Sequence, residues 1–170
     1  DLELICRHAQ DDLATTTNIL TTDLAETCIT LFTPASGNTP ALAECRSSDL
    51  TLAEFRGLTP KMDSFDKTAT TAAASQGGVA PWRSTQYVDG VTSMTHAESI
   101  ALFKSLGTKF TPELKSPAVE MPFNGFSLQD YAQKMIDEYK AAGIPPSDVW
   151  PQSFDLEVVK YWIEHEPEFG

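Results

Sequence analysis

Long apolar runs are missing from this sequence of 170 residues, and no stretch approaches the length of a membrane-spanning helix. Basic residues are also scarce, because 12 Lys and Arg stand against 24 Asp and Glu, for a formal net charge of −12. A surface this acidic repels the phosphate backbone of nucleic acids. The composition therefore argues against a membrane span and against nucleic acid as a partner.

Several catalytic and binding motifs are absent as well. The sequence has no Gly-rich phosphate loop, which disfavours a nucleotide-binding fold. No Gly-x-Ser-x-Gly surrounds Ser153, so this serine is not expected to be a hydrolase nucleophile. The cysteines lack the spacing of a structural zinc site. What remains is a chain long enough for one domain with a sizeable core.

Only three cysteines are present, and two of them predict a disulfide. Cys28 and Cys45 bracket a loop over 33–40 that is rich in Pro, Gly, Thr and Ser. A bridge would restrain that loop and would indicate an oxidising compartment. The alternative is two unrelated free thiols. Cys6 lies in an apolar stretch and is expected to be a small buried residue.

The order of the expected elements favours an α/β fold. Strands are predicted over 2–8, 109–115 and 149–154. Helices are expected to begin at the capping boxes Thr51/Glu54 and Thr95/Glu98, at Ser127 with Asp130, and at Asp155. Residues 59–94 lack periodicity and read as a long insertion. Alternating strands and helices predict βαβ units and a parallel sheet within a single domain over 1–170.

Polar residues near the carboxyl ends of the predicted strands are the candidates for a site: His8, Glu113, Lys115 and Ser153. Ligands bind at this edge in α/β sheets and barrels. Glu113 and Lys115 are two residues apart, so both side chains point to one side of the strand. Glu113 is expected to be a metal ligand, a catalytic group or half of a buried ion pair. Lys115 is either its partner or an anion-binding cation.

The histidines differ in what their positions indicate. His8 follows a predicted strand and suits either a general acid or base or a hydrogen-bonded structural residue. His96 lies in the first turn of a capped helix and is interpreted as structural. His165 lies near the acidic end of the last helix and is expected to be solvated.

The ordered motifs resemble those of the glycerophosphodiester phosphodiesterase family, in its larger, secreted and fungal-like type. The resemblance is carried by a strand ending in His8, Thr15-Thr16-Thr17-Asn18, Leu52-Ala53-Glu54-Phe55, Pro112-Glu113-Leu114-Lys115 and Gln152-Ser153-Phe154. It covers nearly the whole chain. It implies a (β/α)8 TIM barrel, present here as an incomplete section with the insertion at about 59–94, and a secreted protein.

The resemblance also implies roles for individual residues. His8 matches a catalytic histidine that protonates the leaving alcohol, and Glu113 matches a ligand of a divalent metal, Ca²⁺ or Mg²⁺. Lys115 matches a phosphate-contacting lysine, and Phe154 is expected to line the substrate pocket. The expected reaction is metal-dependent hydrolysis of a small-molecule glycerophosphodiester to glycerol 3-phosphate and an alcohol. The headgroup is expected to meet the insertion, with Trp82, Arg83 and Tyr87 as its contacts.

The sequence departs from the family pattern in three ways. The His-Arg pair and the Glu-x-Asp pair of the family are absent, and Ala9 stands where an Asp is common. A barrel needs about 250 residues, so the chain is expected to be a section without appreciable activity. One alternative is a non-catalytic barrel relative that binds a phosphorylated ligand. Another is a barrel lipase that acts on lysophospholipid headgroups by internal transesterification.

Overall fold

The structure is a computed structural model, and it describes residues 2–78, 82 and 90–169. Contacts divide the chain into two compact units. The first comprises Gln10–Ser93, and the second comprises Leu2–Ala9 together with Met94–Gly170. No helix within the described ranges is both long and apolar enough to cross a membrane.

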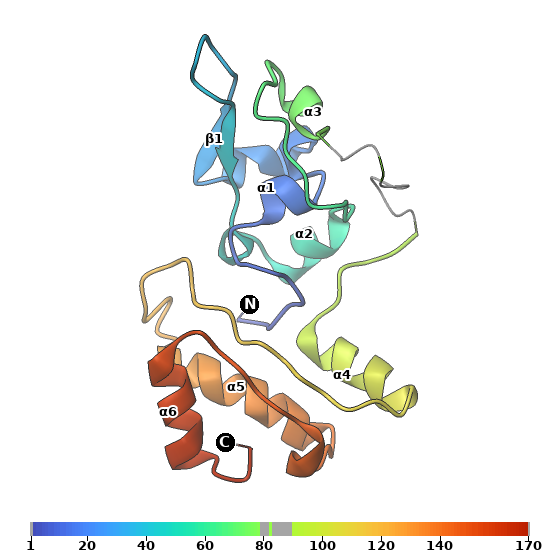
Figure 1. The fold of residues 1–170 in the computed structure, drawn as a ribbon, viewed down its shortest axis with the longest axis vertical. Coiled ribbons are helices and arrows are strands. Elements are labelled where there is room, and N and C mark those ends of the chain that lie inside the picture. Colours follow the sequence, from blue (N-terminus) through green and yellow to red (C-terminus); the bar gives the residue numbers. More distant parts are fainter. Residues whose placement is uncertain (1, 79–81, 83–89, 170) are drawn as a thin grey trace. The chain divides into compact units, whose positions relative to one another are not determined.

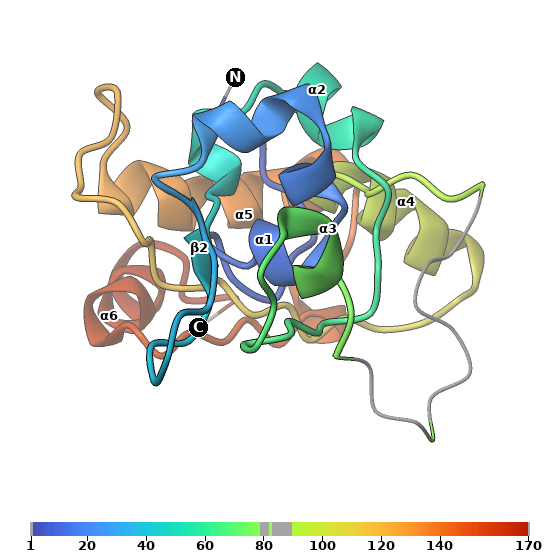
Figure 2. The same ribbon diagram turned by 90° about the horizontal axis from the view of Figure 1, so that it is seen from above.

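The first unit is built from short elements around a small core. They are α1 (Leu13–Thr16), the 3-10 helices η1 (Ile19–Thr21), η2 (Asp23–Thr27) and η3 (Ser47–Asp49), strands β1 (Thr30–Thr33) and β2 (Leu42–Glu44), α2 (Leu52–Gly57) and α3 (Ala72–Ser75). Helix α1 lies beside β2 (Figure 2). Leu13, Ile19 and Phe55 are almost fully buried, so the short helices pack through their apolar side chains.

A disulfide joins Cys28 to Cys45, the pair at which the sequence predicted a bridge. Cys28 follows η2, and Cys45 follows β2. Strands β1 and β2 pair in antiparallel register, with Thr30 opposite Glu44. The bridge therefore closes the base of the β1–β2 hairpin, and the predicted loop forms its tip, where Ser36 pairs with Thr39.

The second unit contains α4 (His96–Ser105), α5 (Leu128–Ala141), the 3-10 helix η4 (Pro146–Asp148) and α6 (Leu156–His165). Helices α5 and α6 pack side by side (Figure 1). Apolar side chains spaced along α5, among them Met135 and Ile136, form the core with Val158 and Trp162 of α6. This spacing places them on one face of each helix.

The helix starts are confirmed. Complete capping boxes begin α2 at Thr51 with Glu54, α4 at Thr95 with Glu98, and α5 at Ser127 with Asp130. In each, the cap oxygen accepts from the backbone N–H three residues later, and the acidic side chain accepts from the cap N–H. Asp155 caps α6 by accepting from the N–H of Glu157.

The TIM-barrel prediction is wrong. Within the described residues the only sheet has two strands, β1 and β2, and they are antiparallel. Segment 2–8 is not a buried strand, because it is largely exposed and its one bridge to another described residue is the antiparallel bridge from Ile5 to Thr95. Cys6 is accordingly exposed rather than buried.

The other two predicted strands pair with each other, but only through isolated bridges. Phe110 lies opposite Val149, and Glu113 lies opposite Gln152, both in parallel orientation. Pro112 has no N–H to donate between these bridges, which limits the ladder. These two extended segments are joined through α5. The other parallel pairing in the described chain is a single isolated bridge in the first unit, between Asp12 and Cys45.

Candidate functional site

The candidate site lies on the paired segments 109–115 and 149–153. Three backbone hydrogen bonds join the two segments, including Leu114 N–H to Gln152 O at 2.8 Å, and a fourth runs from Phe110 N–H to the O of Asp148, directly before the second segment, at 2.9 Å. Phe110 and Leu114 are buried against the core of the second unit. Because side chains alternate along an extended segment, burying these two turns Glu113 and Lys115 away from that core.

Glu113 and Lys115 form an ion pair on this outer side. Lys115 Nζ lies 2.7 Å from Glu113 Oε1, and about a quarter of each side chain is exposed (24% for Glu113 and 27% for Lys115). Glu113 Oε1 is buried, and apart from this ion pair it has no hydrogen-bond partner among the residues that the structure describes. The carboxylate thus relies on one cation for its charge and keeps unused capacity as an acceptor.

The residues next to this pair have different surroundings. Ser153 Oγ donates to Leu114 O at 2.9 Å and accepts from Asp155 N–H at 3.1 Å. It therefore holds the second segment to the first and to the start of α6, as a structural residue. Phe154 is 90% exposed. Its predicted place in a substrate pocket stays a prediction.

His8 is not brought to the ion pair by any hydrogen bond or ion pair within the described part of the chain. It is exposed and follows the segment that is held to the start of α4 by Cys6 N–H to Met94 O at 2.9 Å and His96 N–H to Leu4 O at 2.8 Å. Of the three predicted contacts of the headgroup, Trp82 is exposed. Arg83 and Tyr87 lie outside the described residues.

The described residues do not fit the metal that the resemblance implies. No group of three or more His, Cys, Asp or Glu in residues 2–78, 82 and 90–169 is arranged to hold a metal ion. Glu113 supplies a single carboxylate, whereas Ca²⁺ and Mg²⁺ take six or more oxygen ligands.

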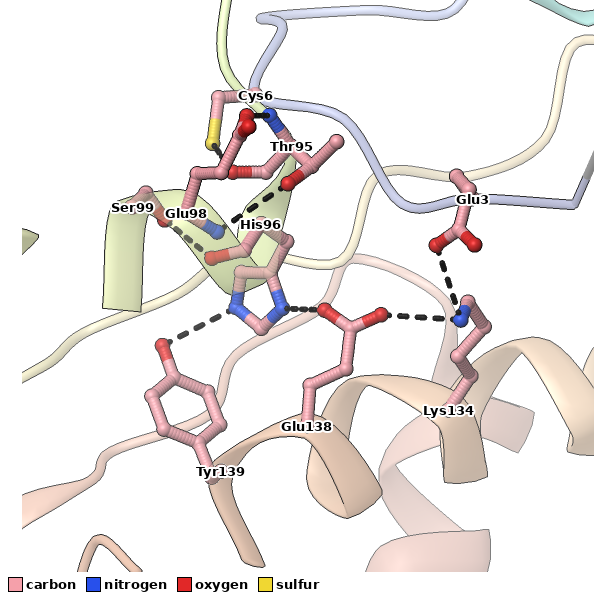
Figure 3. Close-up of polar contacts among 9 residues, drawn as sticks. All are labelled: Glu3, Cys6, Thr95, His96, Glu98, Ser99, Lys134, Glu138 and Tyr139. Carbon is pink, nitrogen blue, oxygen red and sulfur yellow. Dashed lines mark hydrogen bonds and ion pairs between the residues drawn. The ribbon is translucent and has the colours of Figure 1, made fainter. Parts of the chain in front are cut away.

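A second polar cluster, which the sequence did not predict, is centred on His96 (Figure 3). His96 Nδ1 lies 2.7 Å from Glu138 Oε2, and His96 Nε2 lies 3.2 Å from the Tyr139 hydroxyl. Lys134 pairs with the other oxygen of Glu138 at 3.1 Å and with Glu3 at 3.4 Å. The cluster ties α4 and the segment 2–9 to one face of α5.

The electrostatics of this cluster fit a structural role. Burial raises the pKa of Glu138, but hydrogen bonds from His96 and Lys134 outweigh it and leave that pKa below its usual value. Burial, with Cys6 and Glu138 nearby, raises the pKa of Tyr139. Cys6 is exposed as a whole residue, but its thiol donates weakly to Thr95 O at 3.6 Å, and partial burial of the sulfur raises the pKa of the thiol. A thiol with a raised pKa is a poor nucleophile at neutral pH.

His96 was interpreted as structural from its place in the first turn of a helix, but its partners could not be predicted. Glu138 and Tyr139 are more than forty residues away along the chain. No spacing rule links residues at that separation. The signal in the sequence was limited to the i,i+4 pair of Lys134 and Glu138 on α5.

Comparison with known proteins adds one relative. No protein-family model matches the chain, and no solved structure matches it. The chain is 40% identical over 111 residues to a protein of Arthroderma benhamiae named "Extracellular protein". The match covers 64% of this chain and 45% of the relative, so it spans about half the length of that protein.

Proposed function

We propose that this chain contributes a phosphate-binding segment to the extracellular hydrolysis of glycerophosphodiesters. The observation that carries the proposal is the partly buried Glu113–Lys115 pair on segment 109–115, which pairs in parallel with the segment around Val149 and Gln152. Extracellular location is supported by the name of the relative and by the Cys28–Cys45 disulfide. The order of motifs that resembles the phosphodiesterase family supports the substrate class.

Lys115 is the residue that would contact the phosphate. The chain has a net charge of −12, which repels an anionic ester. Such an ester therefore binds only where an accessible cation makes the local electrostatic potential positive. Lys115 is partly exposed, and within the described residues its ion-pair partner is Glu113. A phosphate oxygen would take the place of that carboxylate at the ammonium. Binding would exchange one charge-assisted contact of the ammonium for another.

The second candidate is phosphate-ester binding without hydrolysis. The observation that favours it is the lack, within the described residues, of any three-ligand cluster for a metal. His8 also makes no hydrogen bond or ion pair with Glu113 or Lys115 there. On this alternative the chain binds the ester through Lys115 and supplies neither the metal nor the acid.

One experiment tests both candidates. Glycerophosphocholine is titrated with the chain and followed by phosphorus NMR, with Ca²⁺, with Mg²⁺ and with a chelator. Line broadening that Lys115→Met abolishes and Lys109→Met retains supports phosphate binding, because Lys109 is a mostly exposed lysine paired with Asp148. Metal-dependent release of glycerol 3-phosphate favours the hydrolase, and binding without release favours the second candidate. Binding that survives Lys115→Met, or no binding at all, overturns both.

A further inference from the structure

The segment before α5 ends in a tight two-residue hairpin whose tip is Asn124-Gly125. Phe123 and Phe126 exchange both backbone hydrogen bonds at 2.9 Å. Asn124 and Gly125 both have positive φ, 51° and 80°, as a type I′ turn requires. Both tip residues are exposed. Backbone hydrogen bonds therefore hold the hairpin at its base, and the Asn124 side chain and the backbone of the tip are exposed to solvent.

We propose that Asn124-Gly125 is a modification site, at which the folded chain converts Asn124 spontaneously to aspartate and isoaspartate. The Gly125 nitrogen, after losing its proton to hydroxide, attacks the Asn124 side-chain carbonyl carbon. A carbon–nitrogen bond forms, the side-chain amide bond breaks, and ammonia leaves. Water then opens the cyclic imide on either side, which gives Asp or the isomer linked through its side chain.

Three features of this tip favour the attack. Glycine has no Cβ to hinder ring closure, and a Cβ built on Gly125 would meet nothing within 4 Å. The Gly125 N–H donates no hydrogen bond to any residue that the structure describes, so the nucleophile is free. Rotation of Asn124 towards it needs only local opening of the hairpin, because two hydrogen bonds close the turn.

The chain contains two other asparagines, and both are protected, so they serve as internal controls. Asn38 is equally exposed in another two-residue hairpin, but the nitrogen that follows it, on β-branched Thr39, donates to Ser36 O at 3.0 Å. Asn18 is half-buried, and its side-chain oxygen accepts from Thr59 N–H at 2.8 Å. The nitrogen after Asn18 is bound to Thr17 Oγ1.

The conversion would change the molecule at a defined place. It adds a negative charge three residues before Ser127, the cap of α5. In the isoaspartate product the backbone of a two-residue turn gains a methylene, which is incompatible with the exchange of hydrogen bonds between Phe123 and Phe126. The expected result is a population of chains that differ in charge and in the geometry of this hairpin.

The test is ageing of the folded chain in mildly alkaline buffer, followed by peptide mapping with mass spectrometry and an isoaspartate methyltransferase assay. Conversion several times faster at Asn124 than at Asn38 and Asn18, and absent in Asn124→Gln, supports the proposal. The denatured chain is aged in parallel. An Asn124 that persists in the folded chain but converts after denaturation would show that the turn protects it, and this overturns the proposal. Equal rates at Asn124 and Asn38 overturn it as well.

Discussion

His96 of α4 and Glu138 of α5 are joined by a contact of 2.7 Å between Nδ1 and Oε2, with both side chains nearly buried. Glu138 also accepts from Lys134 on its own helix, and the other nitrogen of His96 faces Tyr139. The start of α4 is thereby fixed to α5 next to the apolar core, to which Tyr139 belongs. Removing either partner of a buried carboxylate leaves its charge less compensated and destabilises the fold.

His96→Ala is expected to destabilise the second unit by about 2 kcal/mol, because it leaves Glu138 buried with one partner fewer. Urea unfolding followed by circular dichroism measures the loss. Lys160→Met is the control, since Lys160 and Glu157 form a well-exposed pair, and its effect should stay within about 0.5 kcal/mol. Equal effects of the two variants would contradict a structural role for His96.

Acid is expected to weaken the same contact. Because the folded-state pKa of Glu138 lies below its usual value, its ionised form stabilises the fold above the unfolded-state pKa. That contribution is lost as the pH falls through the lowered pKa. Glu138→Gln, measured by urea unfolding across acidic pH, should therefore lose stability less steeply than the native chain. Parallel curves would contradict this.

Reduction of the Cys28–Cys45 disulfide is expected to lower the stability of the first unit by about 3 kcal/mol. The bridge spans 17 residues and restrains the unfolded chain. Thermal unfolding of Cys28→Ala/Cys45→Ala, compared with the native chain with and without reductant, measures the change. Cys6→Ala keeps the bridge and should remain sensitive to reductant. A native chain that unfolds at the same temperature with and without reductant would rule out a stabilising bridge.

Local features of the fold could be predicted from the sequence, and non-local pairing could not. The capping boxes at Thr51, Thr95 and Ser127 act over three residues, so their residue types determine the helix starts. The disulfide followed from a loop between two cysteines. The barrel prediction failed because strand partners are set by distant residues. In the described chain the bridge of segment 2–8 is to Thr95. The alternation of apolar and polar residues within the segment carries no information about that distant partner.

In the candidate site, too, the local relationship was predicted from the sequence and the non-local contacts were not. Glu113 and Lys115 are neighbours because of the two-residue period of extended backbone, and the sequence predicted their shared side. His8 was added from its expected position at a common sheet edge, but no hydrogen bond or ion pair among the described residues joins it to Glu113 or Lys115. The His96–Glu138 contact was missed because it joins two helices far apart in sequence.

Trp162→Phe is expected to destabilise α6 against α5 by about 1.5 kcal/mol, because the Trp162 indole N–H donates to Ala132 O at 3.0 Å in a fully buried position. Trp150→Phe is the matched control, since Trp150 is 52% exposed. Urea unfolding followed by circular dichroism compares the two variants. A larger effect from Trp150→Phe would contradict the packing of α5 and α6.

Lys61 is a buried lysine whose hydrogen bonds go to uncharged oxygens. Its ammonium donates to Thr15 O at 2.6 Å, to Ser64 O at 2.7 Å and to Met62 O at 3.1 Å. It thereby fixes the segment after α2 to the end of α1. Burial lowers the pKa of Lys61 from 10.5 to about 8, against a smaller opposing effect of Asp63.

The lowered pKa predicts a rise in stability with pH. Between about 8 and 10.5 the unfolded chain keeps a proton on Lys61 that the folded chain releases, so folding becomes more favourable as the pH rises through that window. The full change is about 3 kcal/mol. Below about pH 8 both states are protonated, and the contribution is constant. Lys61→Met removes the titration, so the difference between native and variant unfolding free energies, measured in urea across this window, should grow with pH. A difference that stays flat would place the folded-state pKa of Lys61 at its ordinary value.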